Sequence, residues 1–224
     1  MRAFVRYLLA SPHALPPALP PSAVFCALIQ AGDALTPRLG LQAGTRVELL
    51  REASSVAFEE GALFPPSAIR EGLNALVMGA LQAGEGGAQA QALALAQGRS
   101  ALPLLLMRAL QLAALKVADM RPAVAQLLSL VTGRLGGGAF EPLGVLQAGG
   151  GEARAPVWEG YVRLVKIIVD LALPALPELP PAHLQCLLQR EGDLRKRFAK
   201  WLPTWQGRDS AQGRAAAEVL RVIG

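Results

Sequence analysis

The chain contains 224 residues, of which 52% are hydrophobic and 17% are charged, and its formal net charge is +5. This hydrophobic content excludes an intrinsically disordered chain, and the length is sufficient for a sizeable buried core. The most apolar segment, 93–117, is interrupted by Arg99, Arg108 and Lys116 before it reaches the about 18 apolar residues that span a membrane. The modest positive charge attracts polyanions in general and does not by itself indicate a nucleic-acid-binding protein.

The N-terminal segment has two alternative interpretations. Arg2 and Arg6 stand in a stretch without acidic residues, which fits either a transit peptide or a first helix followed by a Pro-rich loop. The prolines of 16–21 then predict a helix over about 22–31, because proline is well tolerated in a first helical turn. Thr36 and Pro37 predict a further helix start, and the Thr45/Glu48 capping-box spacing predicts a helix that ends near 58.

The middle of the chain predicts two strongly apolar helices. Ser67 opens a helix whose apolar stripe runs from Ile69 to Leu81. The Gly/Ala-rich segment near 83–98 then indicates an insertion. Ser100 is predicted to cap a helix that is apolar over more than half its circumference as far as Val117, so that helix should be central.

The C-terminal half predicts a series of helices separated by proline and glycine. A helix over 122–135 precedes a second Gly/Ala-rich insertion, near 136–155, and Pro156 opens the next helix with Tyr161 on its apolar face. A Pro-punctuated stretch, 174–181, leads into a short helix around 183–190. Asp193 is predicted to cap the following helix and Ser210 the last one.

Together these patterns predict an all-α chain of roughly eight to ten helices joined by short loops, with no convincing strand. Consecutive helices this close in sequence should pack as antiparallel pairs, as they do in helical-repeat stacks. We therefore expect one domain over 1–224, an irregular HEAT-like or solenoid-like stack with the two insertions described above.

Chemical motifs are scarce in the sequence. His13 and His183 lack a Cys, Asp or Glu at ligand spacing, and no metal, phosphate-loop, dinucleotide or nucleophile motif occurs. The sequence therefore predicts a protein that is not an enzyme, with no metal, no cofactor, no small-molecule substrate and no membrane partner.

One basic cluster has the character of a binding surface. The pattern favours an amphipathic helix whose aromatic residues are core and whose cations face water. The alternative is a contact with RNA or with an acidic partner, because the cations alternate with aromatic residues that are able to stack on bases. The cluster consists of Arg195, Lys196, Arg197 and Lys200 with Phe198, Trp201 and Trp205.

Four stretches resemble the C-terminal domain of the symplekin family, and they occur in that family's order. The two most specific are LPLLLMR at 102–108 and VWEGYVR at 157–163. The others are LPP at 19–21 with ALTP at 34–37, and Phe58-Glu59 with Phe64 and the helix that follows. Leu127 to Leu135 follow the 102–108 stretch, and LPELP at 176–180 and GDLR at 192–195 follow the 157–163 stretch.

The resemblance implies a non-catalytic scaffold of the pre-mRNA cleavage and polyadenylation machinery, and hence a nuclear protein. Its partners would be the C-terminal regions of the endonuclease subunit and of that subunit's inactive paralogue, with RNA contacted weakly or indirectly. The two specific motifs are architectural in the first place. As partner contacts they would offer Trp158, Tyr161, Arg163 and Arg108.

The sequence departs from the family where a polar stretch is expected after the tryptophan motif. The apolar Lys166-Ile167-Ile168-Val169 stands there instead. The alternative function is that of a helical-repeat RNA-binding protein, for which an organellar location is an option. It would need a regular repeat and a basic stripe along successive helices, whereas the cations gather near Arg195.

Overall fold

A computed structural model describes residues 20–38, 58, 64–85, 102, 105–117, 119–135 and 155–224. Within these residues the secondary structure is helical, with nine α-helices and no strand, so the all-α prediction is confirmed. The transit-peptide alternative and the Thr45/Glu48 helix lie outside the described residues, as does nearly all of both insertions. The chain divides into two compact units, 1–120 and 121–224. A helical-repeat arrangement and a single domain over 1–224 stay predictions.

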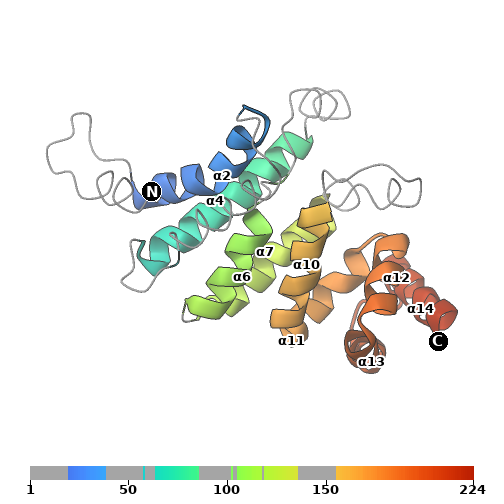
Figure 1. Ribbon diagram of the computed structural model, residues 1–224. Coiled ribbons are helices and arrows are strands. Elements are labelled where there is room, and N and C mark those ends of the chain that lie inside the picture. The colour runs from blue at the N-terminus through green and yellow to red at the C-terminus, as the bar shows by residue number, and fades with distance from the viewer. Residues whose placement is uncertain are drawn as a thin grey trace, which may run out of the picture. The chain divides into compact units, whose positions relative to one another are not determined.

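Unit 1 is built on the pairing of α2 (Pro21–Arg38) with α4 (Pro66–Glu85), which lie side by side in Figure 1. Phe25 of α2 is fully buried and meets Phe58 and Phe64 edge to face, at centroid separations of 5.8 and 5.6 Å. Gly72 of α4 allows this approach, because a Cβ there would lie 2.5 Å from the Phe25 ring. The separate helix start predicted at Thr36 is wrong, since α2 continues through that position.

In the described part of unit 1, α6 (Leu106–Lys116) also packs against α4 and buries eight of its eleven residues. This burial confirms the prediction of a central helix. The helix begins later than predicted from Ser100, because Leu102 lies in a bend before it. Leu105 takes the N-cap position without a side-chain cap.

Unit 2 begins with α7 (Arg121–Leu130), which continues as the short π-helix η1 (Val131–Leu135). The tryptophan motif forms α10 (Ala155–Ile167), which starts beside Pro156 as predicted and is followed by α11 (Val169–Ala172). Val157, Leu164 and Val165 of α10 are buried, as is Ile168 at the N-cap of α11. The Pro-punctuated stretch then forms a 3₁₀ segment, η2 (Leu173–Glu178), which is largely buried.

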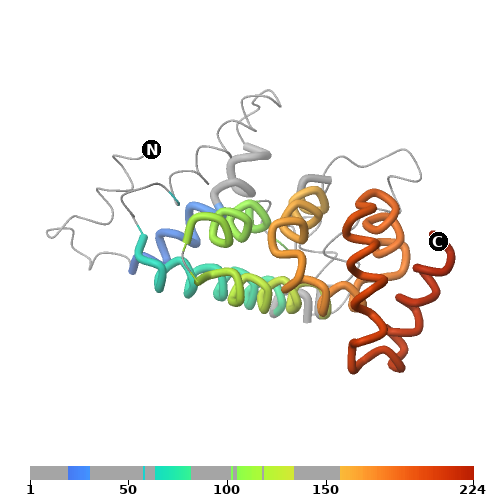
Figure 2. Tube along the Cα trace, turned by 90° about the horizontal axis from the view of Figure 1, so that it is seen from below, coloured from blue at the N-terminus to red at the C-terminus, as the bar shows by residue number. Residues whose placement is uncertain are grey.

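Three helices complete unit 2: α12 (Pro181–Arg190), α13 (Gly192–Trp201) and α14 (Ala211–Ile223). Figure 2 shows them close together at the C-terminal end of the chain. Between α13 and α14 the chain makes one short 3₁₀ turn, η3 (Leu202–Thr204). The Ser210 cap is confirmed, because its Oγ accepts a hydrogen bond from the Gly213 amide at 3.1 Å. Asp193 lies inside the first turn of α13 rather than at its N-cap, which is Glu191.

Candidate partner-binding surface

The buried side of α10 carries an aromatic cluster. Trp158 and Tyr161, one helical turn apart, stack with their ring centroids 5.6 Å apart and their planes 10° apart. His183 of α12 meets the Trp158 ring edge-on at 5.4 Å. Trp158 is 4% exposed and Tyr161 is fully buried, so this cluster joins α10 to α12.

A hydrogen-bond chain attaches the same cluster to the start of unit 2. The Thr132 hydroxyl lies 2.8 Å from the Leu128 carbonyl oxygen and 3.1 Å from the Tyr161 hydroxyl. Because a hydroxyl has one proton and the carbonyl can only accept, Thr132 donates to Leu128, and Tyr161 donates to Thr132. Burial raises the pKa of the Tyr161 hydroxyl above its ordinary value. Tyr161 therefore acts as a neutral donor inside the core.

This geometry bears on two residues predicted as partner contacts. The rings of Trp158 and Tyr161 are enclosed by the chain's own side chains, which gives both residues an architectural role. A partner could reach either ring only if α10 separated from its neighbours. Whether they contact a partner stays a prediction.

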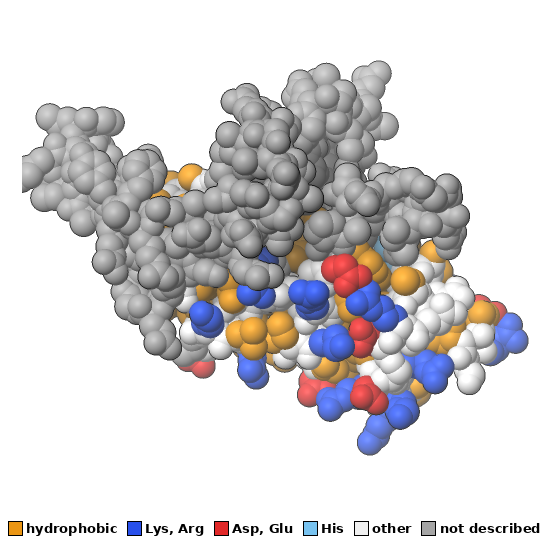
Figure 3. Space-filling view, in the orientation of Figure 1, with side chains coloured by type: hydrophobic (Ala, Val, Ile, Leu, Met, Phe, Trp, Pro, Cys, Tyr) orange, Lys and Arg blue, Asp and Glu red, His pale blue; other side chains and the backbone are white. Residues whose placement is uncertain are grey.

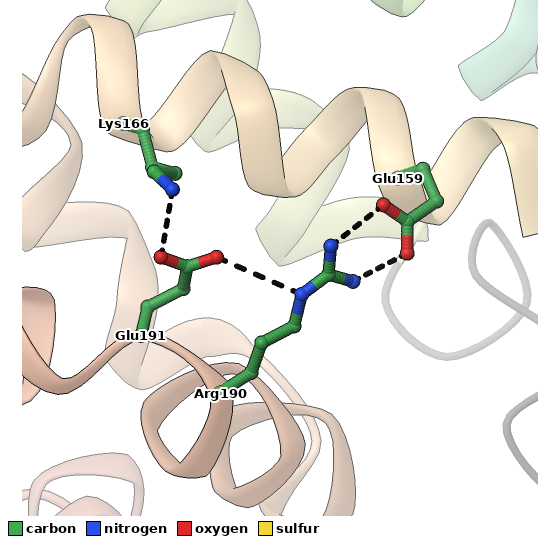
Figure 4. A network of polar contacts seen from close by, with 4 residues as sticks. All are labelled: Glu159, Lys166, Arg190 and Glu191. Carbon is green, nitrogen blue, oxygen red and sulfur yellow. Dashed lines mark hydrogen bonds and ion pairs between the residues drawn. The ribbon is translucent and has the colours of Figure 1, made fainter.

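The opposite side of α10 is charged and forms the network in Figure 4. Both Glu159 carboxylate oxygens accept hydrogen bonds from the Arg190 guanidinium at the end of α12, with Nη2 and Oε2 2.9 Å apart. Arg190 Nε also lies 3.6 Å from Glu191 Oε1. The other carboxylate oxygen of Glu191 forms an ion pair with Lys166 Nζ at 2.9 Å. The hydrogen bond from Arg190 lowers the pKa of the Glu159 carboxyl, and partial burial opposes this. The network therefore fixes α10 against the end of α12 from the solvent side.

Arg163 lies on the same charged side of α10, four residues after Glu159 and three before Lys166. Residues at these spacings are neighbours on a helix surface. Its side chain is exposed, and its charge contributes to lowering the pKa of Glu159. Of the motif residues predicted to contact a partner, Arg163 is therefore the one in unit 2 that solvent and a partner can reach.

Arg108, from the other specific motif, lies on α6 in unit 1. It is exposed, whereas its neighbours Met107 and Ala109 are buried. Whether Arg108 contacts a partner stays a prediction.

The predicted basic cluster lies on α13. Arg195 is partly buried and donates to the Ile223 carbonyl oxygen at 2.9 Å, so it fixes α13 to the end of α14. Lys196, Arg197 and Lys200 are exposed on the outer face of the helix, and Trp201 is partly exposed beside them. Figure 3 shows many Lys and Arg side chains gathered over this part of unit 2.

The cluster confirms part of the amphipathic-helix interpretation. Phe198 is fully buried and stacks on Trp201, with centroids 5.9 Å apart. Trp201 in turn stacks on Trp205 at 5.7 Å. The aromatic residues therefore form a ladder that runs from the core of unit 2 to its surface, with exposed cations beside it.

Sequence reasoning missed several residues of these surfaces. Arg190 and Asp170 pair with residues 31 and 27 positions away, and sequence spacing does not reveal such partners. The spacing of Glu159, Arg163 and Lys166 is a signal that could have revealed part of this surface, because those positions share one helical face.

No helix in the described part of the chain is long and apolar enough to span a membrane. Among the same residues, no group of three or more His, Cys, Asp or Glu side chains is placed to hold a metal ion. No family model matches the sequence, and neither a curated protein nor a solved structure is significantly similar to it.

Proposed function

We propose that the chain is a non-catalytic scaffold module of the nuclear mRNA 3′-end cleavage and polyadenylation machinery. In this role it binds the C-terminal regions of the endonuclease subunit and of the inactive paralogue. The proposal starts from the four ordered motifs that resemble the symplekin C-terminal domain. It concerns protein–protein interaction, and no catalytic step is assigned to the chain.

The observation that supports the proposal best is the division of α10 into two faces. The aromatic residues of the tryptophan motif organise the core, while Glu159, Arg163 and Lys166 of the same helix face solvent. A scaffold needs a rigid helix that presents a fixed set of side chains, because preorganised side chains lose less entropy on binding. The stack beneath α10 and the network at its end supply that rigidity.

Arg163 is the motif residue best placed to contact a partner on this face. Its guanidinium can form two parallel hydrogen bonds to a carboxylate, or bind several backbone carbonyls at a helix end. Lys166 and Glu159 on either side are engaged with Glu191 and Arg190. A partner that docks here would therefore meet a pre-ordered charged strip with Arg163 at its centre.

Charge reversal at Arg163 tests the proposal. The full chain is co-expressed with tagged C-terminal regions of the two partners, and the amount recovered with the tag is compared among variants. Arg163→Glu should reduce recovery by about tenfold or more. Arg214→Glu, an equal charge change at an exposed position of α14, should leave recovery unchanged.

The other outcomes also decide the question. Equal recovery of Arg163→Glu and wild type would show that the Arg163 face of α10 is not part of the contact. Failure of the wild-type chain to co-purify with either partner, while it is folded by circular dichroism, would overturn the proposed function.

A further inference from the structure

The outer face of α13 concentrates positive charge. Within its ten residues the helix has four cations and one carboxylate, Asp193. Lys196, Arg197 and Lys200 occupy neighbouring positions on one exposed face, because residues three and four apart lie side by side on a helix. Such a face attracts a polyanion and increases its rate of association.

The partners that these cations have within the chain are carboxylates. Arg197 donates to Asp170 of α11 at 3.1 Å, and Lys196 lies 3.8 Å from Asp193. Both carboxylates are highly exposed, and exposed ion pairs contribute little to stability because water screens them. Carboxylates of another chain could therefore replace them at little cost. Lys200 has no ion pair with any described residue and is open to a further carboxylate.

The aromatic residues beside these cations are poorly arranged for stacking on nucleic-acid bases. Trp201 already stacks on both Phe198 and Trp205. The backbone of Gly207 packs against the six-membered ring of Trp205, because a Cβ there would lie 2.6–2.8 Å from three atoms of that ring. A base would have to displace these contacts before it could stack.

An exposed apolar residue near the same cations also suits a peptide. Leu171 follows Asp170 in α11 and is 43% exposed, although it is a large apolar side chain. The Arg197–Asp170 ion pair brings this part of α11 next to α13. A peptide with acidic and apolar side chains can satisfy both features, whereas a phosphate backbone offers nothing to Leu171.

We propose that the outer face of α13, with the adjoining Leu171, binds an Asp/Glu-rich segment of a protein partner. Lys196, Arg197 and Lys200 contact its carboxylates. This surface shares no residue with the Arg163 face of α10, and its use does not depend on which complex the chain serves.

Fluorescence anisotropy with two labelled probes tests this inference on the full chain. One probe is a short peptide of alternating Asp and Glu with a single Leu, and the other is a single-stranded oligouridine of equal net charge. The peptide should bind more tightly than the oligouridine. The double variant Lys196→Glu/Lys200→Glu should bind the peptide about tenfold or more weakly than wild type does.

Two control variants separate a local site from overall charge. Arg70→Glu with Lys116→Glu changes the net charge equally at exposed positions of unit 1 and should leave peptide binding within about twofold of wild type. Leu171→Ser should weaken binding of the peptide and leave binding of the oligouridine unchanged. Oligouridine binding as tight as peptide binding would overturn the inference in favour of RNA. Equal weakening by both charge-reversed pairs would overturn it in favour of non-specific attraction.

Discussion

Arg190 at the end of α12 donates two hydrogen bonds to the carboxylate of Glu159 on α10, across 31 positions of the sequence. This paired geometry is the strongest form of a guanidinium–carboxylate contact. With the Trp158 ring packed against His183 on the buried side, it holds α10 against α12 from both faces.

A double-mutant cycle measures how much this ion pair contributes. Glu159→Gln, Arg190→Gln and the double variant should give a coupling free energy of about 0.5–1 kcal/mol in urea unfolding, since the pair is partly exposed. The Glu218/Arg221 pair on α14 is the control. It lies within one helix and is more exposed, so its coupling should be smaller. A Glu159/Arg190 coupling indistinguishable from zero would show that the Arg190 contact does not stabilise the packing of α10.

The same pair predicts a pH dependence with a definite sign. The Arg190 hydrogen bond lowers the pKa of Glu159 in the folded state, so the carboxylate stabilises the fold above the ordinary glutamate pKa of about 4.3. That contribution disappears as the pH falls through the lowered pKa. The difference in unfolding free energy between wild type and Glu159→Gln should therefore shrink on acidification. A difference that grows in acid would contradict this assignment.

The aromatic cluster on α10 should be sensitive to truncation. Trp158→Ala removes a buried ring that stacks on Tyr161, and we expect a loss of about 3–5 kcal/mol in unfolding free energy. Tyr161→Phe keeps the ring and removes the donor to Thr132, for a loss of about 1 kcal/mol. Arg163→Ala, on the exposed face, should lie within about 0.5 kcal/mol of wild type. A Trp158→Ala variant as stable as wild type would show that Trp158 is not part of the core.

Replacing either of two glycines of α4 by alanine should change the stability in opposite directions. Gly72→Ala places a methyl group against the Phe25 ring and near the Ser22 carbonyl, so we expect a loss of about 1–2 kcal/mol. Gly79→Ala meets open space in the same helix and should stabilise it by about 0.5–1 kcal/mol, because alanine is the better helix former. Thermal unfolding by circular dichroism separates the two. Stabilisation by both changes would contradict the close α2–α4 packing at Gly72.

Removal of the Ser210 cap should destabilise the start of the last helix, α14. Ser210→Ala leaves the Gly213 amide without its acceptor and should cost about 1 kcal/mol in unfolding free energy. Ser210→Asp keeps an acceptor at the same position and should retain stability. Equal destabilisation by Ser210→Asp and Ser210→Ala would show that the Ser210 hydroxyl does not act as the cap.

The all-α fold and several buried faces could be predicted because they depend on local pattern. The 3.6-residue period of α4 and α10 placed Ile69, Leu73 and Tyr161 in the core, where the structure also has them. The burial of the Pro-punctuated stretch was not predicted. Its leucines recur every three residues, at 173, 176 and 179, which matches the 3₁₀ period and puts them on one buried face.

The candidate surfaces were less predictable, because they depend on contacts between distant residues. The sequence placed Trp158 and Tyr161 on one helical face and favoured a role in the core, but it left open whether the two rings also contact a partner. Likewise, it showed alternating cations and aromatic residues on α13. It gave no sign that the tryptophans already stack on one another, or that Arg195 is engaged with the end of α14.

The central claim is that this chain binds both C-terminal regions as a scaffold, and size exclusion with light scattering tests it most directly. The purified full chain is mixed with the purified C-terminal regions of the endonuclease subunit and of its inactive paralogue. We predict one peak that contains all three chains and has the mass of their sum. Three independently eluting species, with the chain folded, would contradict the scaffold function.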